Sequence, residues 1–307
     1  MAPAFCVIGS INMDLVARVD RFPRPGETRT GAGFGTFPGG KGANQAVALA
    51  RLDADVRMFG KLGDDVFGQS YLETFRREAV DTADVEVVPR TSTGVAVIEV
   101  ESAGENTIVI VPGANGLVDS AYIDAHLEQI ATAQYALFQL EIPFDTVEHA
   151  MEAFRRRGGA TILDPAPAPP SGLSGRMLRG ATYLTPNENE ARELTGITVA
   201  DIESADAAAR ILRDRGAETV VIKAGAHGAY VTDDRGTRTV PGFSVKVADT
   251  TAAGDAFNAG LAYGLGEGRT VDEAVRFANA VGALTCTEIG AQSAMPSRAD
   301  AAEFSGG

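Results

Sequence analysis

Short apolar runs alternate with amphipathic stretches along most of the chain. The apolar runs predict buried strands, and they lie at Phe5–Ile8, Val56–Phe59, Ala136–Leu140, Thr161–Leu163, Tyr183–Leu184 and Val220–Ile222. Between them, apolar residues recur with helical spacing at Ala43–Leu52, Gly68–Glu78, Tyr122–Ala131, Phe144–Arg156 and Ala205–Arg215. This alternation predicts an α/β fold, in which helices cover both faces of a mostly parallel central sheet.

One region departs from this rhythm and predicts a second, smaller sheet. Gly94–Val100 and Thr107–Val111 flank a Ser-Ala-Gly-Glu turn, which is typical of a β-hairpin. Residues 13–19 and 30–37 look like further extended segments. A hairpin this rich in valine and isoleucine needs a cover for its apolar face, so a separate sheet is favoured over an ordinary edge hairpin. With no repeat and no long linker, we expect residues 1–307 to form one domain, with lid segments at roughly 13–37 and 91–111.

Polar residues follow several of the predicted strands directly. Asn12 and Asp14 follow the first strand, and Glu141, Asp164 and Asn187 follow later ones. Because ligands of parallel sheets bind at the carboxyl ends of strands, we expect these residues to line one edge of the sheet.

Composition limits the classes of function. The chain of 307 residues has a net charge of -14, which argues against general nucleic-acid binding and against anionic membranes. Cys6 and Cys286 are too few for a disulfide framework and indicate a reducing compartment. The first residues lack the basic region of a signal peptide, and no apolar run reaches membrane-spanning length. We therefore expect a cytoplasmic protein with neither nucleic acid nor membrane as a partner.

The segment from Asp249 to Asp255 carries the clearest candidate chemistry. It runs through hydroxyl and small residues into an apolar helical pattern. The backbone N–H groups of Ala252, Ala253 and Gly254 would be free at the helix start, where they can hold an anion such as a phosphoryl group. A carboxylate at position 255 would repel phosphate, so it is interpreted as a general base. The alternative is an acidic cap on a core helix.

A glycine-rich segment, Gly39–Asn44, precedes another predicted helix. Lys41 and Asn44 offer hydrogen-bond donors, and the glycines let a ligand approach the backbone. It is not a Walker P-loop, because neither Ser nor Thr follows the lysine. A nucleotide-linked dehydrogenase is also disfavoured, because no Gly-x-Gly-x-x-Gly follows the first strand. A purely structural turn is the alternative here.

Together these segments resemble the ribokinase-type (phosphofructokinase-B-like) sugar kinase family over nearly the whole chain. The matching motifs occur in order at Gly9–Asp14, Pro25–Thr28, Gly39–Ala46, Gly63–Asp65, Gln139–Glu141, Asp164–Pro167, Thr185–Glu190 and Asp249–Asp255. The resemblance implies a three-layer α/β/α sandwich with a small β-sheet lid that closes over the sugar and forms a homodimer contact.

The resemblance also implies an activity and a set of site residues. The implied reaction is transfer of phosphate from ATP to the primary hydroxyl of D-ribose, with Asp255 as general base beside the N–H groups of Ala252, Ala253 and Gly254. The implied sugar ligands are Asn12, Asp14, Gly40, Lys41, Asn44, Glu141 and Asp255, and the implied nucleotide ligands are Asn187, Lys223, Gly225, Gly228, Gly254 and Asn279. Glu190 would bind Mg²⁺ through water, and a K⁺ site would comprise Asp249, Thr251, Thr285, Glu288 and Gly290. Ser293 is a further K⁺ ligand only if it replaces the family's serine, whose aligned place holds Ala294.

Several of these residues have simpler interpretations. Asn187 and Glu190 have the spacing of a helix N-terminal box, Asp14 and Asp249 suit capped turns, and Glu141 could be an exposed strand end. The function also has alternatives: a sibling kinase for 2-deoxyribose, fructose, a ketodeoxy acid or adenosine, or a non-catalytic sugar- or nucleotide-binding regulator on the same scaffold.

Overall fold

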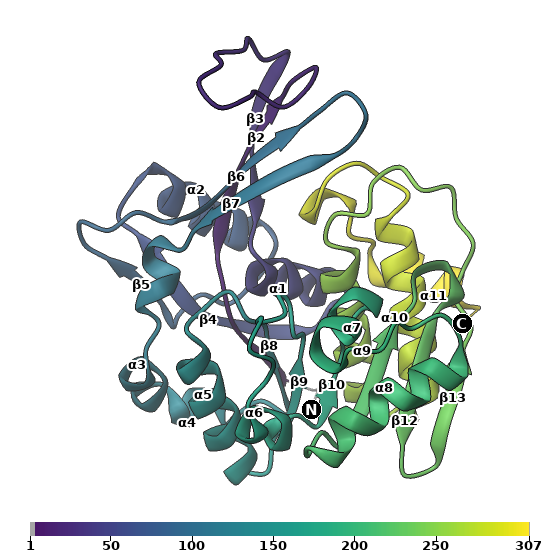
Figure 1. Cartoon of the computed structure of the whole chain (residues 1–307). Helices are drawn as coiled ribbons and strands as arrows, with labels where there is room; N and C mark the ends of the chain where they lie inside the picture. Colours follow the sequence, from purple (N-terminus) through teal and green to yellow (C-terminus); the bar gives the residue numbers. More distant parts are fainter. Residues whose placement is uncertain (1–3, 307) are drawn as a thin grey trace.

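The computed structural model describes residues 4–306 and contains a nine-stranded central sheet (Figure 1). Its strands are β1 (Ala4–Ile8), β4 (Asp55–Gly63), β5 (Val85–Val88), β8 (Tyr135–Phe138), β9 (Ala160–Leu163), β10 (Tyr183–Leu184), β11 (Thr219–Lys223), β12 (Ala229–Asp233) and β13 (Gly236–Val240). The order is β13-β12-β11-β10-β9-β8-β1-β4-β5. Strands from β5 to β11 pair in parallel, and β12 and β13 are antiparallel.

Helices cover both faces of this sheet, as predicted. One layer comprises α1 (Lys41–Arg51), α2 (Val66–Arg77), α9 (Ala253–Gly266), α10 (Val271–Thr285) and α11 (Arg298–Ser305). The other comprises α3 (Ser120–Ala125), α4 (Leu127–Ile130), α5 (Phe144–Arg156), α6 (Gly175–Gly180), α7 (Glu188–Thr195) and α8 (Ile202–Asp214). Alternate residues of β1 serve the two cores: Phe5 and Val7 pack in the first, and Cys6 and Ile8 in the second. The molecule is therefore a three-layer α/β/α sandwich.

One predicted helix is interrupted in the structure, so the prediction of a single helix there is wrong. The chain over Tyr122–Ala131 forms two short helices, which separate at His126. The backbone φ of His126 is -109°, outside the helical range, and its Nδ1 lies 2.8 Å from the carbonyl oxygen of Tyr122. The apolar spacing continued across a break that sequence periodicity alone does not reveal.

A second sheet of four strands projects from the body of the molecule (Figure 1). It contains β3 (Gly33–Gly39), β2 (Asn12–Arg18), β6 (Gly94–Val100) and β7 (Asn106–Val111), in that spatial order. The predicted hairpin is confirmed as the antiparallel pair β6–β7. The strand β2 pairs parallel to β6 and antiparallel to β3, so the small sheet is mixed. Several large apolar side chains of this sheet are exposed, namely Phe34, Phe37, Val97, Ile108, Val109, Ile110 and Val111.

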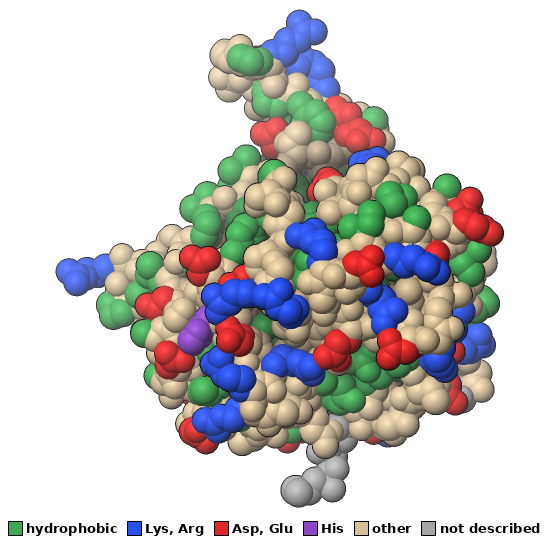
Figure 2. All heavy atoms as spheres, turned by 60° about the horizontal axis from the view of Figure 1, so that its bottom comes forward, with side chains coloured by type: hydrophobic (Ala, Val, Ile, Leu, Met, Phe, Trp, Pro, Cys, Tyr) green, Lys and Arg blue, Asp and Glu red, His purple; other side chains and the backbone are tan. Residues whose placement is uncertain are grey.

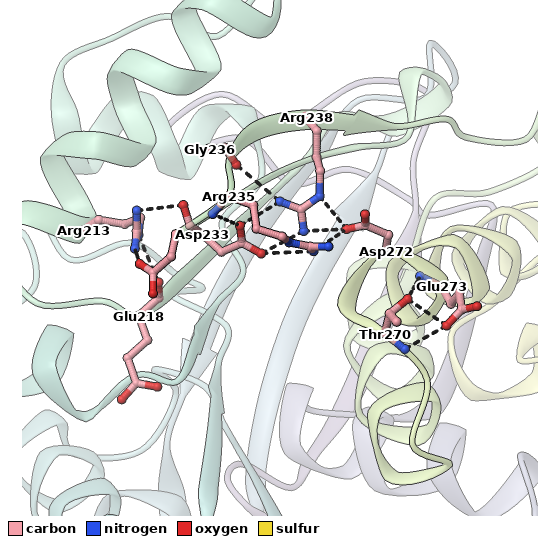
Figure 3. A network of polar contacts seen from close by, with 10 residues as sticks. Arg213, Glu218, Asp233, Arg235, Gly236, Arg238, Thr270, Asp272 and Glu273 are labelled. Carbon is pink, nitrogen blue, oxygen red and sulfur yellow. Dashed lines mark hydrogen bonds and ion pairs between the residues drawn. The ribbon is translucent and has the colours of Figure 1, made fainter.

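A network of ion pairs anchors the β12–β13 hairpin to the start of α10 (Figure 3). The guanidinium of Arg238 contacts Asp233 at 2.8 Å and Asp272 at 2.5 Å. Arg235 contacts the same two carboxylates, each at 3.3 Å. The network joins the sheet edge to a helix that contributes to the candidate site.

The outer surface carries both signs of charge. Figure 2 shows basic and acidic side chains interspersed on the face it displays. Among the described residues, no helix has both the length and the apolar character needed to cross a membrane.

Candidate active site

Asp255 lies buried in the first turn of α9, at the carboxyl edge of the sheet. Its Oδ2 accepts a hydrogen bond from Asn44 Nδ2 at 3.0 Å, and its Oδ1 accepts one from Gln45 Nε2 at 3.2 Å. Burial raises the pKa of Asp255 to about 6; Lys41 opposes this shift, and the carboxylate of Asp164 adds to it. A carboxylate with this pKa is ionised at neutral pH and is well matched to accept a proton.

The start of α9 presents unpaired backbone donors. Ala252 has a φ of 59°, in the left-handed region, and no side chain caps the helix. Within the described part of the chain, the N–H groups of Ala252, Gly254 and Asp255 have no acceptor, whereas Ala253 donates to the carbonyl oxygen of Thr250 at 3.3 Å. The helix dipole adds partial positive charge at this point. The arrangement can hold an anion beside Asp255, although Ala253 is already engaged in the turn.

On the side of the site toward the small sheet, carboxylates surround Lys41. Asp14 on β2 occupies space that only a glycine at position 39 leaves open, because a Cβ there would lie 2.3 Å from Oδ2 of Asp14. Burial raises the pKa of Asp14 to about 7, and the charges of Glu141 and Asp255 add to the shift. Burial by itself would lower the pKa of Lys41, but the nearby carboxylates, Asp255 foremost, raise it above its usual value. Lys41 is therefore a permanent cation among these acids.

Glu141 is held inward rather than exposed. Its Oε2 accepts hydrogen bonds from Ser10 Oγ at 2.6 Å, Asn12 Nδ2 at 3.2 Å and the Lys41 backbone N–H at 3.3 Å. The amide oxygen of Asn12 accepts in turn from Asn115 Nδ2 at 2.7 Å. The polar atoms of Asn12 are thus engaged within the protein, where they orient Glu141.

A layer of amides behind Asp255 was missed at the sequence level. Gln139 Nε2 donates to Gln45 Oε1 at 2.6 Å, and Gln292 Nε2 donates to Asn44 Oδ1 at 3.1 Å. Gln292 also donates to the hydroxyl of Tyr71 at 2.8 Å. Because the amide oxygens of Asn44 and Gln45 are taken, their NH₂ groups must face Asp255. Gln45 and Gln139 lie inside recognised motifs, but no local signal marks Tyr71 or Gln292.

A cavity of about 540 Å³ opens beyond the start of α9. It brings Asp255, the predicted general base, together with the residues predicted to bind a nucleotide. Among its lining residues are Lys41, Asp164, Asn187, Glu190, Lys223, Gly225, Gly228, Gly254, Asp255 and Asn279. Residues that the sequence assigned to two different ligands therefore line one continuous pocket.

Asn187 and Glu190 form the helix N-terminal box that was the simpler interpretation. Asn187 Oδ1 accepts from the backbone N–H of Glu190, and Glu190 Oε2 accepts from that of Asn187, both at 2.8 Å. Glu190 is nevertheless half-buried, and burial raises its pKa, whereas Lys223 opposes the shift. Its Oε1 has no partner within residues 4–306, so it can accept a hydrogen bond from a water molecule of hydrated Mg²⁺. Across that same range, no three His, Cys, Asp or Glu side chains converge to hold a metal directly.

Asn279 on α10 presents an acceptor to the cavity. Its Nδ2 donates to the carbonyl oxygens of Val240 and Pro241, each at 3.2 Å. Two carbonyl partners fix the orientation of the amide, which leaves Oδ1 as the group available to a ligand. This arrangement suits a base that carries a donor, such as the amino group of adenine.

Asp249 ties together the two loops of the predicted K⁺ site. Its Oδ1 accepts from the backbone N–H of Thr251 at 2.9 Å, and its Oδ2 accepts from that of Gly290 at 3.0 Å. Burial opposes ionisation, but these hydrogen bonds hold the pKa of Asp249 below its usual range. The Ser293 side chain lies close to Gly290. A Cβ added at Gly290 would lie 2.4 Å from Ser293 Oγ. Asp249 therefore caps its turn and links the two loops, which agrees with its simpler interpretation.

Comparisons with known proteins show what the chain is similar to. Residues 3–298 match the model of the pfkB family of carbohydrate kinases. The chain is 42% identical to a ribokinase of Haemophilus influenzae, over 99% of each chain, and 37% identical to a deoxyribokinase of Salmonella typhi, over 95% of each. It superposes on a ribokinase of Arabidopsis thaliana complexed with ribose and ATP with a TM-score of 0.93, at 32% identity and 99% coverage of both chains.

Proposed function

The chain belongs to the pfkB family of carbohydrate kinases, and on this premise we propose that it phosphorylates D-ribose. In this reaction the γ-phosphoryl group of ATP passes to the primary hydroxyl, which gives D-ribose 5-phosphate and ADP. The observation that carries the proposal is the buried carboxylate of Asp255 beside unpaired N–H groups at the start of α9. The ribokinase relatives support ribose as the sugar, and the deoxyribokinase relative makes 2-deoxyribose the first alternative to test.

In the proposed mechanism Asp255 accepts the proton of the primary hydroxyl as the oxygen attacks phosphorus. The N–H groups of Gly254 and Ala252 bind the oxygens of the phosphoryl group, a form of electrostatic stabilisation that dominates phosphoryl transfer. Asn44 and Gln45 keep the base oriented through their hydrogen bonds. A non-catalytic regulator would not need a buried base with these supports.

Asp14 and Lys41 are the proposed sugar ligands, supported by Asn44 and Glu141. A carboxylate accepts two hydrogen bonds from vicinal hydroxyls, and an ammonium donates to them. 2-Deoxyribose lacks one hydroxyl, so an acceptor at Asp14 would be left without a partner, which is the strongest form of discrimination available to such a site. The acidic cluster also disfavours a sugar that already carries phosphate at that end.

Two cations complete the proposal. Mg²⁺ neutralises charge on the triphosphate when it is bound, and Glu190 would hold its water through the free Oε1. K⁺ would bind backbone carbonyls of Thr251, Thr285, Glu288 and Gly290 in the loops joined by Asp249. Replacing K⁺ by a large organic cation at constant ionic strength should lower the rate, and equal rates would exclude a K⁺ site.

The direct test is an ADP-release assay with ribose, 2-deoxyribose, fructose, adenosine and ribose 5-phosphate. Ribose should give the highest kcat/KM, and the product should be the 5-phosphate. A clear preference for adenosine or for a phosphorylated sugar would refute the assignment to ribose. If ADP were released at the same rate with and without each of these substrates, the kinase mechanism itself would be refuted.

A further inference from the structure

A buried ion pair lies where the sugar end and the nucleotide end of the cavity meet. Lys223 is the last residue of β11, and Asp164 follows β9, one strand away across β10. Lys223 Nζ lies 2.9 Å from Asp164 Oδ1, and the two side chains are only 11% and 3% exposed. Removing one partner of such a pair leaves a buried charge without a counter-charge, which lowers the stability of the folded protein.

The ammonium of Lys223 also lies next to the start of α9. A Cβ placed on Gly254 would lie 3.5 Å from Lys223 Nζ and would meet no other atom within 4 Å. The cation therefore borders the unpaired N–H of Gly254, where an anion would sit. Lys41 is the other cation of the cavity lining close to Asp255, so a phosphoryl group at this point would have a cation from each of two chain segments.

The hydrogen-bonding capacity of Lys223 is only partly used. An ammonium has three N–H donors. Within residues 4–306, its side chain makes one hydrogen bond, to Asp164 Oδ1. Lys223 lines the cavity, and the flexible stem of a lysine lets Nζ adjust without leaving its carboxylate. Asp164 is itself held by Gln45 Nε2 at 3.4 Å, the same amide that contacts Asp255.

We propose that Lys223 is a further catalytic residue, whose free N–H donors contact the oxygens of the phosphoryl group in transfer, and that Asp164 is its positioning residue. This inference rests on the proposed phosphoryl transfer and deepens it. The sugar oxygen bonds to the γ-phosphorus as the bond from phosphorus to the β–γ bridging oxygen breaks. The hydroxyl proton goes to Asp255, the electron pair of the broken bond leaves with ADP, and Lys223 remains protonated throughout.

The first experiment compares Lys223→Met with Lys223→Arg. Methionine keeps an unbranched stem but removes the charge and the donors, so kcat should fall about 10²–10³-fold, the usual effect of losing one donor to a developing anion. The KM for ribose should change little, since the sugar ligands are untouched. Arginine should restore part of kcat, because it keeps a donating cation. Full kcat in Lys223→Met would overturn the proposal, and so would equal losses in the methionine and arginine variants.

A second experiment does not depend on turnover or on the identity of the sugar. Calorimetry should show that Lys223→Met weakens binding of a non-hydrolysable ATP analogue much more than binding of adenosine. The double variant Asp164→Asn/Lys223→Met avoids a stranded buried charge and should show the same selective loss. Equal weakening of both ligands in the double variant would overturn the role of Lys223. If the parent protein phosphorylated no sugar in the panel, the proposed function would fail. The binding comparison between the ATP analogue and adenosine would still show whether Lys223 contacts the phosphates.

Discussion

At the scale of single residues, Asp255 is the position on which the mechanism depends. Asp255→Asn keeps the shape and most hydrogen bonds but cannot accept a proton. We expect kcat to fall about 10²–10⁴-fold, which is the usual contribution of a general base. The KM for ribose should change less, because the proposed sugar ligands Asp14 and Lys41 are untouched. Steady-state kinetics on the folded variant would measure both.

The matched control for this variant is Asp14→Ala, which removes a proposed sugar ligand from the same acidic cluster. Its main effect should be a higher KM for ribose. If Asp255→Asn retained the kcat of the parent, another group would have to be the base.

Protonation of the same two residues predicts a pH dependence. Asp14, with a pKa of about 7, and Asp255, with a pKa of about 6, take up protons in turn as the pH falls. In the proposed mechanism both must be ionised, Asp14 to accept hydrogen bonds from the sugar and Asp255 to accept a proton. We therefore expect kcat/KM for ribose to fall from pH 8 to pH 5, more steeply than one group would give.

Asp164→Asn tests the origin of this pH profile, and Asp234→Asn is its control. The charge of Asp164 raises the pKa of Asp255, so its removal should move the acid limb to lower pH. Asp234 is 98% exposed and should leave the limb in place. A profile that stays flat down to pH 5 would show that neither carboxylate titrates as described.

At the scale of elements, the close contact of α9 and α10 aligns the two ends of the site, because α9 carries Asp255 and α10 carries Asn279. A Cβ at Gly264 would lie 2.9 Å from the Cα of Ala274, which is closer than real contacts allow. Gly264→Ala should force the helices apart and lower the free energy of unfolding by about 1–3 kcal/mol. Urea denaturation would measure the loss.

Gly33→Ala is the control for that substitution. A Cβ at Gly33 meets nothing within 4 Å, and its φ is not in the left-handed region. It should leave the urea midpoint nearly unchanged. Equal stability of both variants would show that the helices can adjust without cost.

At the scale of the whole molecule, the apolar surface of the small sheet predicts self-association. Monomeric proteins rarely leave so many large apolar side chains together in water. We propose a homodimer in which two such sheets cover each other. Sedimentation should give a dimer for the parent protein, and Phe34→Glu should shift it toward the monomer.

Val66→Glu provides the matched control for the dimer. Val66 is 71% exposed and Phe34 is 72% exposed, but Val66 belongs to α2 and is not a residue of the small sheet. The control should therefore remain dimeric. A monomeric parent protein would contradict the proposed contact, and so would a dimer that survives Phe34→Glu.

Local patterns in the chain determined the architecture and the location of the site. Alternating apolar runs predicted the α/β sandwich, because strand and helix periodicities are properties of neighbouring residues. Motifs that follow strands predicted that Asp14, Glu141 and Asp164 lie at one edge of the sheet, because ligands of parallel sheets bind at the carboxyl ends of strands. The small sheet was also foreseen from its hairpin. These features required no knowledge of distant contacts.

Tertiary structure alone decided how the site residues are held. Asn44 and Asp255 are 211 positions apart, and Tyr71 meets Gln292 across 221, so no local pattern could pair them. Only the packed fold showed that Asn12 orients Glu141 and that Lys223 is held by Asp164. A side chain's hydrogen-bond partners depend on which strands and helices become neighbours, and that is settled by packing over the whole chain rather than by sequence proximity.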